Sequence, residues 1–124
     1  EQLLASKPQV ILMAGYESVT SAVAMQVGQD IDAANVLTRL KGFTQRPGWS
    51  DLPAVHDGRV YAVYHGATRS IMDAALLQFM AKALYPALFK DLDPKATYLG
   101  FYQRYLPIRP HGTFMLGLNG SDQI

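Results

Sequence analysis

Five side chains with binding chemistry stand directly after, or at the end of, two segments that are predicted to be strands. They offer two phenol rings, a carboxylate, an imidazole and a guanidinium: Tyr16, Glu17, Tyr64, His65 and Arg69. In open parallel sheets, ligands collect outside the carboxyl ends of the strands. We therefore expect these side chains to share one edge of the domain. Because Arg69 would also stand at the start of a long helix, where backbone N–H groups favour anions, the edge suits an anionic ligand.

Each of these side chains also has an explanation that needs no ligand. Tyr16 and Tyr64 are also typical of ordinary aromatic residues at strand ends, and His65 is typical of a turn. Glu17 fits a solvated surface position. Arg69 fits one too, although a cation is poorly placed near the start of a helix. The sequence leaves both explanations open.

The two strands that must position this edge differ in their patterns. Residues 9–14 form a continuous apolar run closed by Gly15, which is typical of a strand buried on both faces of a parallel sheet. Residues 59–64 are rich in β-branched and aromatic side chains and follow an Asp57-Gly58 turn. A proline-glycine stop at residues 47–48 separates this strand from the preceding helix.

Helical patterns surround the two strands. Helices are expected over residues 1–6, over 33–43 after an Asp32 N-cap, over 70–84 after a Ser70 N-cap, and from Asp93-Pro94 to Pro107. Residues 16–30 are expected to form a loop with at most a short helix. The alternation predicts a three-layer α/β domain with a mostly parallel sheet. We assign residues 1–107 to this domain and residues 108–124 to an extended tail that packs on it or is disordered.

Composition excludes several classes of function. The chain has 124 residues, a formal net charge of +1 and no cysteine. The charge gives no reason to expect nucleic acid, and thiol catalysis, disulfides and cysteine-bound metal are excluded. The hydrolase elbow, the phosphate loop and the zinc-protease motif are all missing from the sequence. We therefore expect a protein that is not an enzyme, with no intrinsic cofactor and no metal held by its own side chains.

The connector over residues 46–64 carries a family resemblance. It resembles the C-terminal lobe of the substrate-binding proteins of ABC importers for ferric siderophores, haem and cobalamin. The matching runs are Pro47-Gly48-Trp49, Leu52-Pro53-Ala54-Val55 and Asp57-Gly58-Arg59-Val60-Tyr61. Further runs, in the same order along the chain, are Glu1-Gln2-Leu3-Leu4, Lys7-Pro8-Gln9-Val10-Ile11, Ala81-Lys82-Ala83-Leu84-Tyr85-Pro86, Phe89 and Asp91-Leu92-Asp93-Pro94. The resemblance covers residues 1–107.

This resemblance implies a two-lobed periplasmic binding protein whose lobes are joined by a rigid helix. The ligand, a ferric siderophore, haem or cobalamin, would lie between the lobes and pass to an ABC permease and its ATPase. This chain would supply half of the cleft, and the N-terminal lobe is missing from it. The resemblance places the protein in the periplasm, or outside the cell on a membrane anchor. It also implies that Glu1 docks into an arginine pocket on the permease.

Two other functions stay open at this point. One is a free-standing α/β binding module that self-associates through the apolar face that a partner lobe would cover. The other is a lobe of a nitrogenase-like metal-cofactor protein, against which the absence of cysteine counts. The chain begins with Glu1 inside a predicted helix, which suggests a fragment or a processed product.

Overall fold

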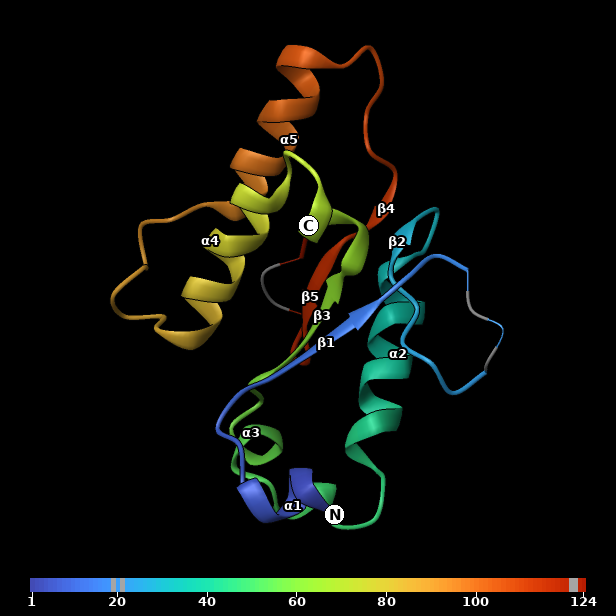
Figure 1. The fold of residues 1–124 in the computed structure, drawn as a ribbon, viewed down its shortest axis with the longest axis vertical. Helices are drawn as coiled ribbons and strands as arrows, with labels where there is room; N and C mark the ends of the chain where they lie inside the picture. The colour runs from blue at the N-terminus through green and yellow to red at the C-terminus, as the bar shows by residue number, and fades with distance from the viewer. Residues whose placement is uncertain (19, 21, 121–122) are drawn as a thin grey trace.

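A three-stranded sheet forms the centre of the computed structural model, and helices cover both of its faces (Figure 1). In sheet order, the strands are β1 (Ile11–Gly15), β3 (Val60–Tyr64) and β5 (Met115–Gly117). Helix α2 (Ala33–Thr44) lies on one side of the sheet, and helices α4 (Asp73–Leu84) and α5 (Pro94–Tyr105) lie on the other. The structure describes residues 1–18, 20, 22–120 and 123–124. Further short elements are α1 (Gln2–Ser6), β2 (Gly28–Gln29), η1 (Trp49–Asp51), α3 (Pro53–His56), η2 (His65–Arg69) and β4 (Gly112–Thr113).

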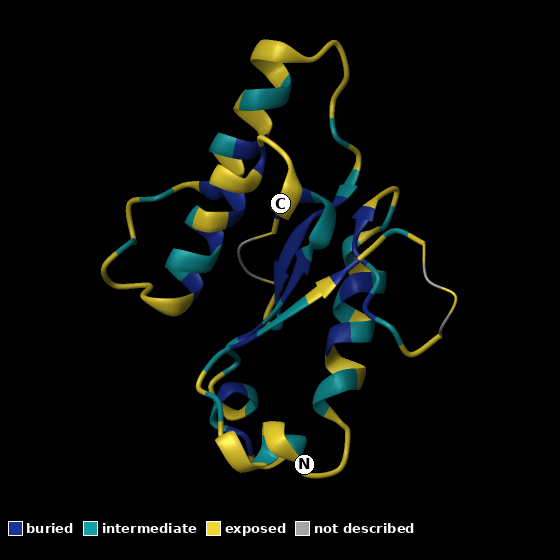
Figure 2. Cartoon of the chain, in the orientation of Figure 1, coloured by how far each residue is buried: buried dark blue, intermediate teal, exposed yellow. Residues whose placement is uncertain are grey.

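The alternation of side chains along β3 divides the core into two clusters, because successive residues of a strand point to opposite faces. Val60 and Ala62 pack with Leu40 of α2 in one cluster. Val63 packs with Phe79 of α4 in the other cluster. Complete burial of a side chain such as Leu40 contributes about 1.5–3 kcal/mol. Figure 2 shows the mainly buried strands β3 and β5 between partly exposed helices, which confirms the predicted three-layer α/β architecture. β1 stands at the edge of the sheet and is only partly buried, where burial on both faces was expected.

The strands pair in two directions. β1 and β3 are parallel, with Gly15 opposite Tyr64 at their carboxyl ends. β5 pairs with β3 antiparallel. The central sheet is therefore mixed, where a mostly parallel one was expected. The additional antiparallel strand comes from residues 108–124, and its three residues are too few to show an alternating pattern in the sequence.

The segment that follows α5 is built into both sheets of the protein. Phe114, Met115 and Leu116 are 4%, 0% and 1% exposed. Before them, β4 pairs antiparallel with β2 in a separate two-stranded sheet. Gly112 has a φ of +137°, and a Cβ atom there would overlap the carbonyl oxygen of Gly28. The close approach of β2 and β4 thus depends on a residue without a side chain.

Two of the three predicted helix N-caps are present in the structure. The Asn35 N–H donates to Asp32 Oδ1 (2.7 Å), and the Ala96 N–H donates to Asp93 Oδ1 (2.9 Å). These contacts confirm the two aspartate caps. Ser70 is not the N-cap of α4, because residues 65–69 form the 3₁₀ turn η2 and the helix begins later, after Met72. The Ser70 hydroxyl instead accepts from the Met72 N–H (3.2 Å).

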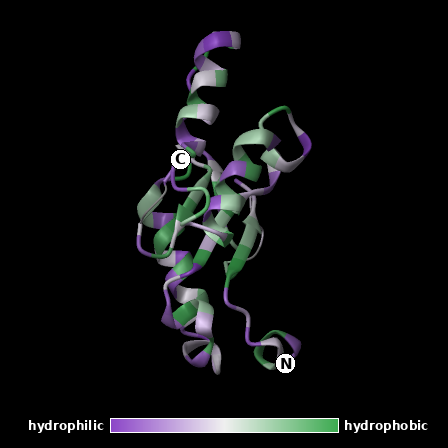
Figure 3. Cartoon of the chain, turned by 90° about the vertical axis from the view of Figure 1, so that its left-hand side faces the viewer, coloured by the Kyte–Doolittle hydropathy of each residue, from purple (hydrophilic) through white to green (hydrophobic). Residues whose placement is uncertain are grey.

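The amino ends of the two parallel strands meet α1 and α3, near the N-terminus in Figure 1. The Ala54 N–H of α3 donates to the Pro8 carbonyl (3.0 Å), which joins the two strand entries. Figure 3 shows mainly hydrophobic strands in the middle of the molecule and helices of mixed character around them. Within the described residues, no helix combines the length and the apolar character that crossing a membrane requires.

Candidate ligand-binding edge

The carboxyl ends of β1 and β3 bring two rings together. Because Gly15 is opposite Tyr64 in the parallel register, the residues that follow each strand start side by side. The ring centroids of Tyr16 and His65 are 4.8 Å apart, with the ring planes tilted by 52°. Tyr16 is 50% exposed. The expected meeting of the two strand ends at one edge is therefore confirmed, and it presents an aromatic pair to solvent.

Beside this pair, Tyr64 and Glu17 interact directly. A side-chain hydrogen bond with Glu17, together with partial burial, raises the pKa of Tyr64 to about 12. The Tyr64 ring also meets Phe114 edge to face, with centroids 5.6 Å apart. Tyr64 therefore keeps its phenol proton at neutral pH, and its ring forms part of the wall that supports the edge.

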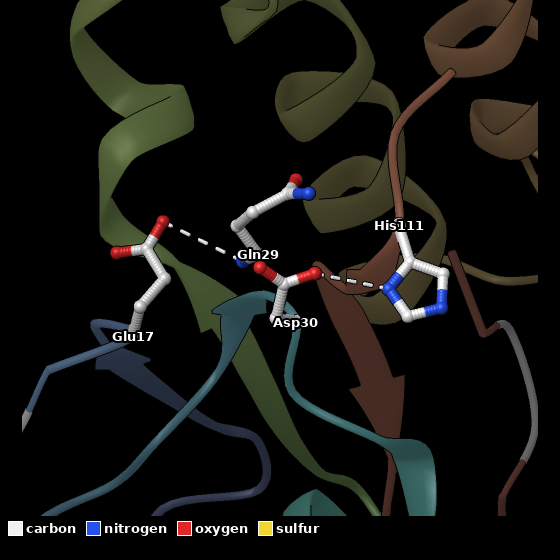
Figure 4. Close-up of polar contacts among 4 residues, drawn as sticks. All are labelled: Glu17, Gln29, Asp30 and His111. Carbon is white, nitrogen blue, oxygen red and sulfur yellow. Dashed lines mark hydrogen bonds and ion pairs between the residues drawn. The ribbon is translucent and has the colours of Figure 1, made fainter. Parts of the chain in front are cut away.

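Two hydrogen bonds, one from β2 and one from a residue just before it, fix the position of Glu17. The Gln29 N–H donates to Glu17 Oε1 (3.5 Å), and Gln26 Nε2 donates to the Glu17 carbonyl (2.8 Å). Figure 4 shows the Glu17 carboxylate directed toward Gln29. A Cβ atom on Gly28 would lie 2.8 Å from Glu17 Cγ and 2.9 Å from Tyr64 Cε2. Gly28 thus leaves the space that the Glu17 and Tyr64 side chains occupy.

A second contact, between Asp30 and His111, joins the loop after β2 to the loop before β4. His111 Nδ1 lies 3.0 Å from Asp30 Oδ1, and the Asp30 N–H donates to the His111 carbonyl (2.8 Å). Both side chains are largely exposed, and Figure 4 shows them directed toward each other. This contact could not be predicted from local patterns, because the two residues come from loops far apart along the chain.

An aromatic stack connects the edge to helix α5. Tyr98 is 1% exposed and packs on Phe114 (5.0 Å between centroids) and on Tyr102 (5.4 Å). Burial, and secondarily a hydrogen bond with Tyr102, raises the pKa of Tyr98. Since Phe114 also contacts Tyr64, one continuous row of rings runs from the end of β3 to α5.

Two predicted residues lie apart from these contacts. Arg69 is exposed at the end of η2, and α4 begins only at Asp73, so its guanidinium does not stand at the first turn of that helix. Within the described residues, Arg69 forms no hydrogen bond or ion pair with the other four predicted residues. Glu1 is exposed before α1, at the amino ends of the strands. Ligand contact by Arg69 and permease docking by Glu1 stay predictions.

Other surface features lie away from this edge. The space between α4 and α5 forms a groove lined partly by Ile71, Ala75, Gly100 and Phe101. In the part of the chain that the structure describes, no three histidine, aspartate or glutamate side chains gather as they would around a metal ion.

The chain is similar to a solved protein structure over most of its length. No protein-family model and no curated protein sequence matches the chain. Among solved structures, the TroA-like periplasmic binding protein FepB from Veillonella parvula superimposes with a TM-score of 0.89 and 36% sequence identity. The match covers 94% of this chain and 34% of that protein, so the chain spans about a third of its length. That protein is a binding protein, and the similarity confirms the resemblance found in the sequence.

Proposed function

Because this chain has the fold of one lobe of a TroA-like periplasmic binding protein, we propose that it binds an iron-siderophore-type metal chelate and delivers it to an ABC importer permease. The Tyr16–His65 ring pair supports this proposal most directly. It lies at the carboxyl ends of β1 and β3, where ligands bind to open α/β sheets. The remaining length of a protein like FepB would supply the facing wall of the cleft.

The chemistry of the edge suits a large chelate. The half-exposed Tyr16 ring provides a flat apolar face, and its contact with His65 restricts the directions in which it can turn. Arg69 adds a positive charge that would approach an anionic chelate as it enters. Ferric catecholate and hydroxamate complexes, haem and cobalamin all expose broad faces that can pack on such rings.

The metal in this proposal is held by its chelator. In the protein without ligand, the hydrogen bond with Glu17 and partial burial keep the Tyr64 phenol protonated at neutral pH. His65 packs its ring against Tyr16. In this proposal the edge recognises the outer surface of the chelate. The metal stays coordinated by its chelator while the protein binds and releases the ligand.

Transport requires partners beyond the ligand. We place the protein in the periplasm, or outside the cell on a membrane anchor, and its partners are an ABC permease with its ATPase. Glu1 is exposed and free of a side-chain capping bond to α1, so it is available for docking. Its place at the amino ends of the strands leaves the ring pair free to hold a ligand while the permease is engaged.

Fluorescence quenching tests the proposal on the full-length protein that carries this chain. The probes are a ferric trihydroxamate, a ferric tricatecholate, haemin and cyanocobalamin, with free tryptophan as the correction for light absorbed by each probe. We expect saturable quenching by at least one probe and weaker binding in Arg69→Ala. The matched control is Arg104→Ala, an exposed cation on α5. If none of the four probes quenches the protein, the proposed function is wrong.

A further inference from the structure

In the described residues of the loop that carries Tyr16 and Glu17, regular structure is limited to a bridge and the short strand β2. After β1, the backbone is tied back by the Val27 N–H, which donates to the Tyr16 carbonyl (3.1 Å), and by a bridge between Tyr16 and Gln26. The short strand β2 follows. Side chains from the body of the protein add further contacts to the described part of this loop.

Arg39 of α2 supplies several of these contacts. Its Nη1 donates to the carbonyls of Ala22 and Ala24, both at 2.9 Å. Its Nε donates to Asn35 Oδ1 at 3.1 Å. The half-buried guanidinium therefore connects two loop carbonyls to a side chain one helical turn earlier, using the fixed fork of donors that only arginine has.

The contacts continue from Arg39 toward the edge. Asn35 Nδ2 donates to Gln26 Oε1 (3.5 Å), and Gln26 Nε2 donates to the Glu17 carbonyl (2.8 Å). Asn35 is itself fixed through its backbone N–H, which donates to the Asp32 cap. A series of side-chain hydrogen bonds thus runs from the rigid helix α2 to the residue beside the ring pair.

We propose that Arg39 is a positioning residue: it holds the loop after β1 in the conformation that presents Tyr16 and Glu17 to the ligand. This inference rests on the proposed function, since the position of the two side chains matters only if the edge receives a ligand. Among the described residues, Arg39 forms no hydrogen bond with Tyr16 or His65, and it would act through Asn35, Gln26 and the loop carbonyls.

The first test needs no ligand. Hydrogen exchange is followed by NMR in the unmodified chain and in Arg39→Ala. The probe in the loop is the Val27 amide, which donates to the Tyr16 carbonyl. The reference probe is the amide of Ile11, the first residue of β1, which donates to the Arg59 carbonyl. We expect exchange of the Val27 amide to become about tenfold faster, as befits the loss of charged hydrogen bonds, while Ile11 is unchanged. Unchanged exchange at Val27, or equal acceleration at both amides, would overturn the proposal.

The matched control is Arg46→Ala. Arg46 follows α2, and its guanidinium lies over the Phe43 ring at 4.1 Å from the centroid. Both arginines line the same shallow pocket beside the loop. We expect Arg46→Ala to leave Val27 exchange unchanged, because no hydrogen bond from Arg46 to the loop carbonyls is present in the described residues. Acceleration of Val27 exchange equal to that of Arg39→Ala would contradict a specific role for Arg39.

The second test measures binding in the full-length protein, with whichever of the four probes it quenches. Arg39→Ala should raise the Kd about tenfold, and Arg46→Ala should leave it within about twofold. Arg39→Lys keeps the charge and much of the aliphatic stem and should still bind more weakly than the unmodified protein, since an ammonium lacks the fork. Full affinity in Arg39→Ala or Arg39→Lys would overturn the positioning role. If the unmodified protein binds no probe, the proposed function fails, while hydrogen exchange still decides the role of Arg39.

Discussion

The rings of Tyr16 and His65 lie 4.8 Å apart although each residue follows a different strand. The parallel register of β1 and β3, with Gly15 opposite Tyr64, produces this contact. The backbone of the sheet therefore sets the position of the aromatic pair before any ligand arrives. A surface fixed in advance loses less conformational entropy on binding than one that must be ordered.

Removal of the Tyr16 ring should separate binding from stability. In Tyr16→Ala we expect the Kd for the bound chelate to rise about tenfold or more, because a stacking face is lost. Since Tyr16 is 50% exposed, the free energy of unfolding should change by less than about 1 kcal/mol. Calorimetric titration and urea denaturation measure the two quantities. Tyr105→Ala, also exposed but on α5, is the control and should leave the Kd unchanged.

Two glycine substitutions should have opposite signs. Gly28→Ala places a methyl group against Glu17 and Tyr64 in a backbone with a φ of +133°, and we expect a loss of about 1–3 kcal/mol in unfolding free energy. Gly42→Ala adds its methyl group to open space inside α2 and should gain about 0.5–1 kcal/mol. Urea denaturation of both variants measures the difference. Equal effects would contradict the described packing at Gly28.

Tyr64 should titrate late in alkali. Its pKa in the folded protein is about 12, above the value of 10.0 for an unperturbed tyrosine. A raised pKa stabilises the fold fully below about pH 10, and this contribution is lost as the pH rises from 10 toward 12. Absorbance at the phenolate band should show this late phase, and Glu17→Gln should move it to lower pH. A titration of Glu17→Gln identical to that of the unmodified protein would contradict the hydrogen bond.

Residues after α5 should be needed for folding. Met115→Ala removes a completely buried side chain from β5, and we expect a loss of about 2–5 kcal/mol in unfolding free energy. Ile108→Ala, in the same segment but 63% exposed, should change it by less than about 0.5 kcal/mol. A chain that ends at residue 107 should lack cooperative unfolding by circular dichroism. Cooperative unfolding of that shortened chain would show that β5 is dispensable.

Local sequence patterns predicted most of the helices and strands. They could not predict contacts between residues far apart along the chain. The apolar run before Gly15, the turn before β3, and the caps Asp32 and Asp93 each carry their signal within a few residues. Strand β5 has only three residues, so its alternation is too short to recognise.

At the edge, strand polarity alone was enough to bring Tyr16 and His65 together. The support for Glu17 could not be predicted, because Gln26 and Gln29 meet it only in the tertiary fold and Gly28 leaves the space that its side chain occupies. Arg69 was expected at the start of a helix. It lies instead in the 3₁₀ turn η2, and α4 begins only at Asp73.

The site at which a chelate contacts the protein can be located by NMR. The full-length protein is titrated with the diamagnetic gallium form of the ferric chelate that it binds, and the histidine and tyrosine ring signals are followed by NMR. We expect saturable shifts of the His65 and Tyr16 rings, while His56 of α3, at the amino ends of the strands, stays unchanged as an internal control. Binding that shifts His56 and leaves His65 and Tyr16 unmoved would contradict it.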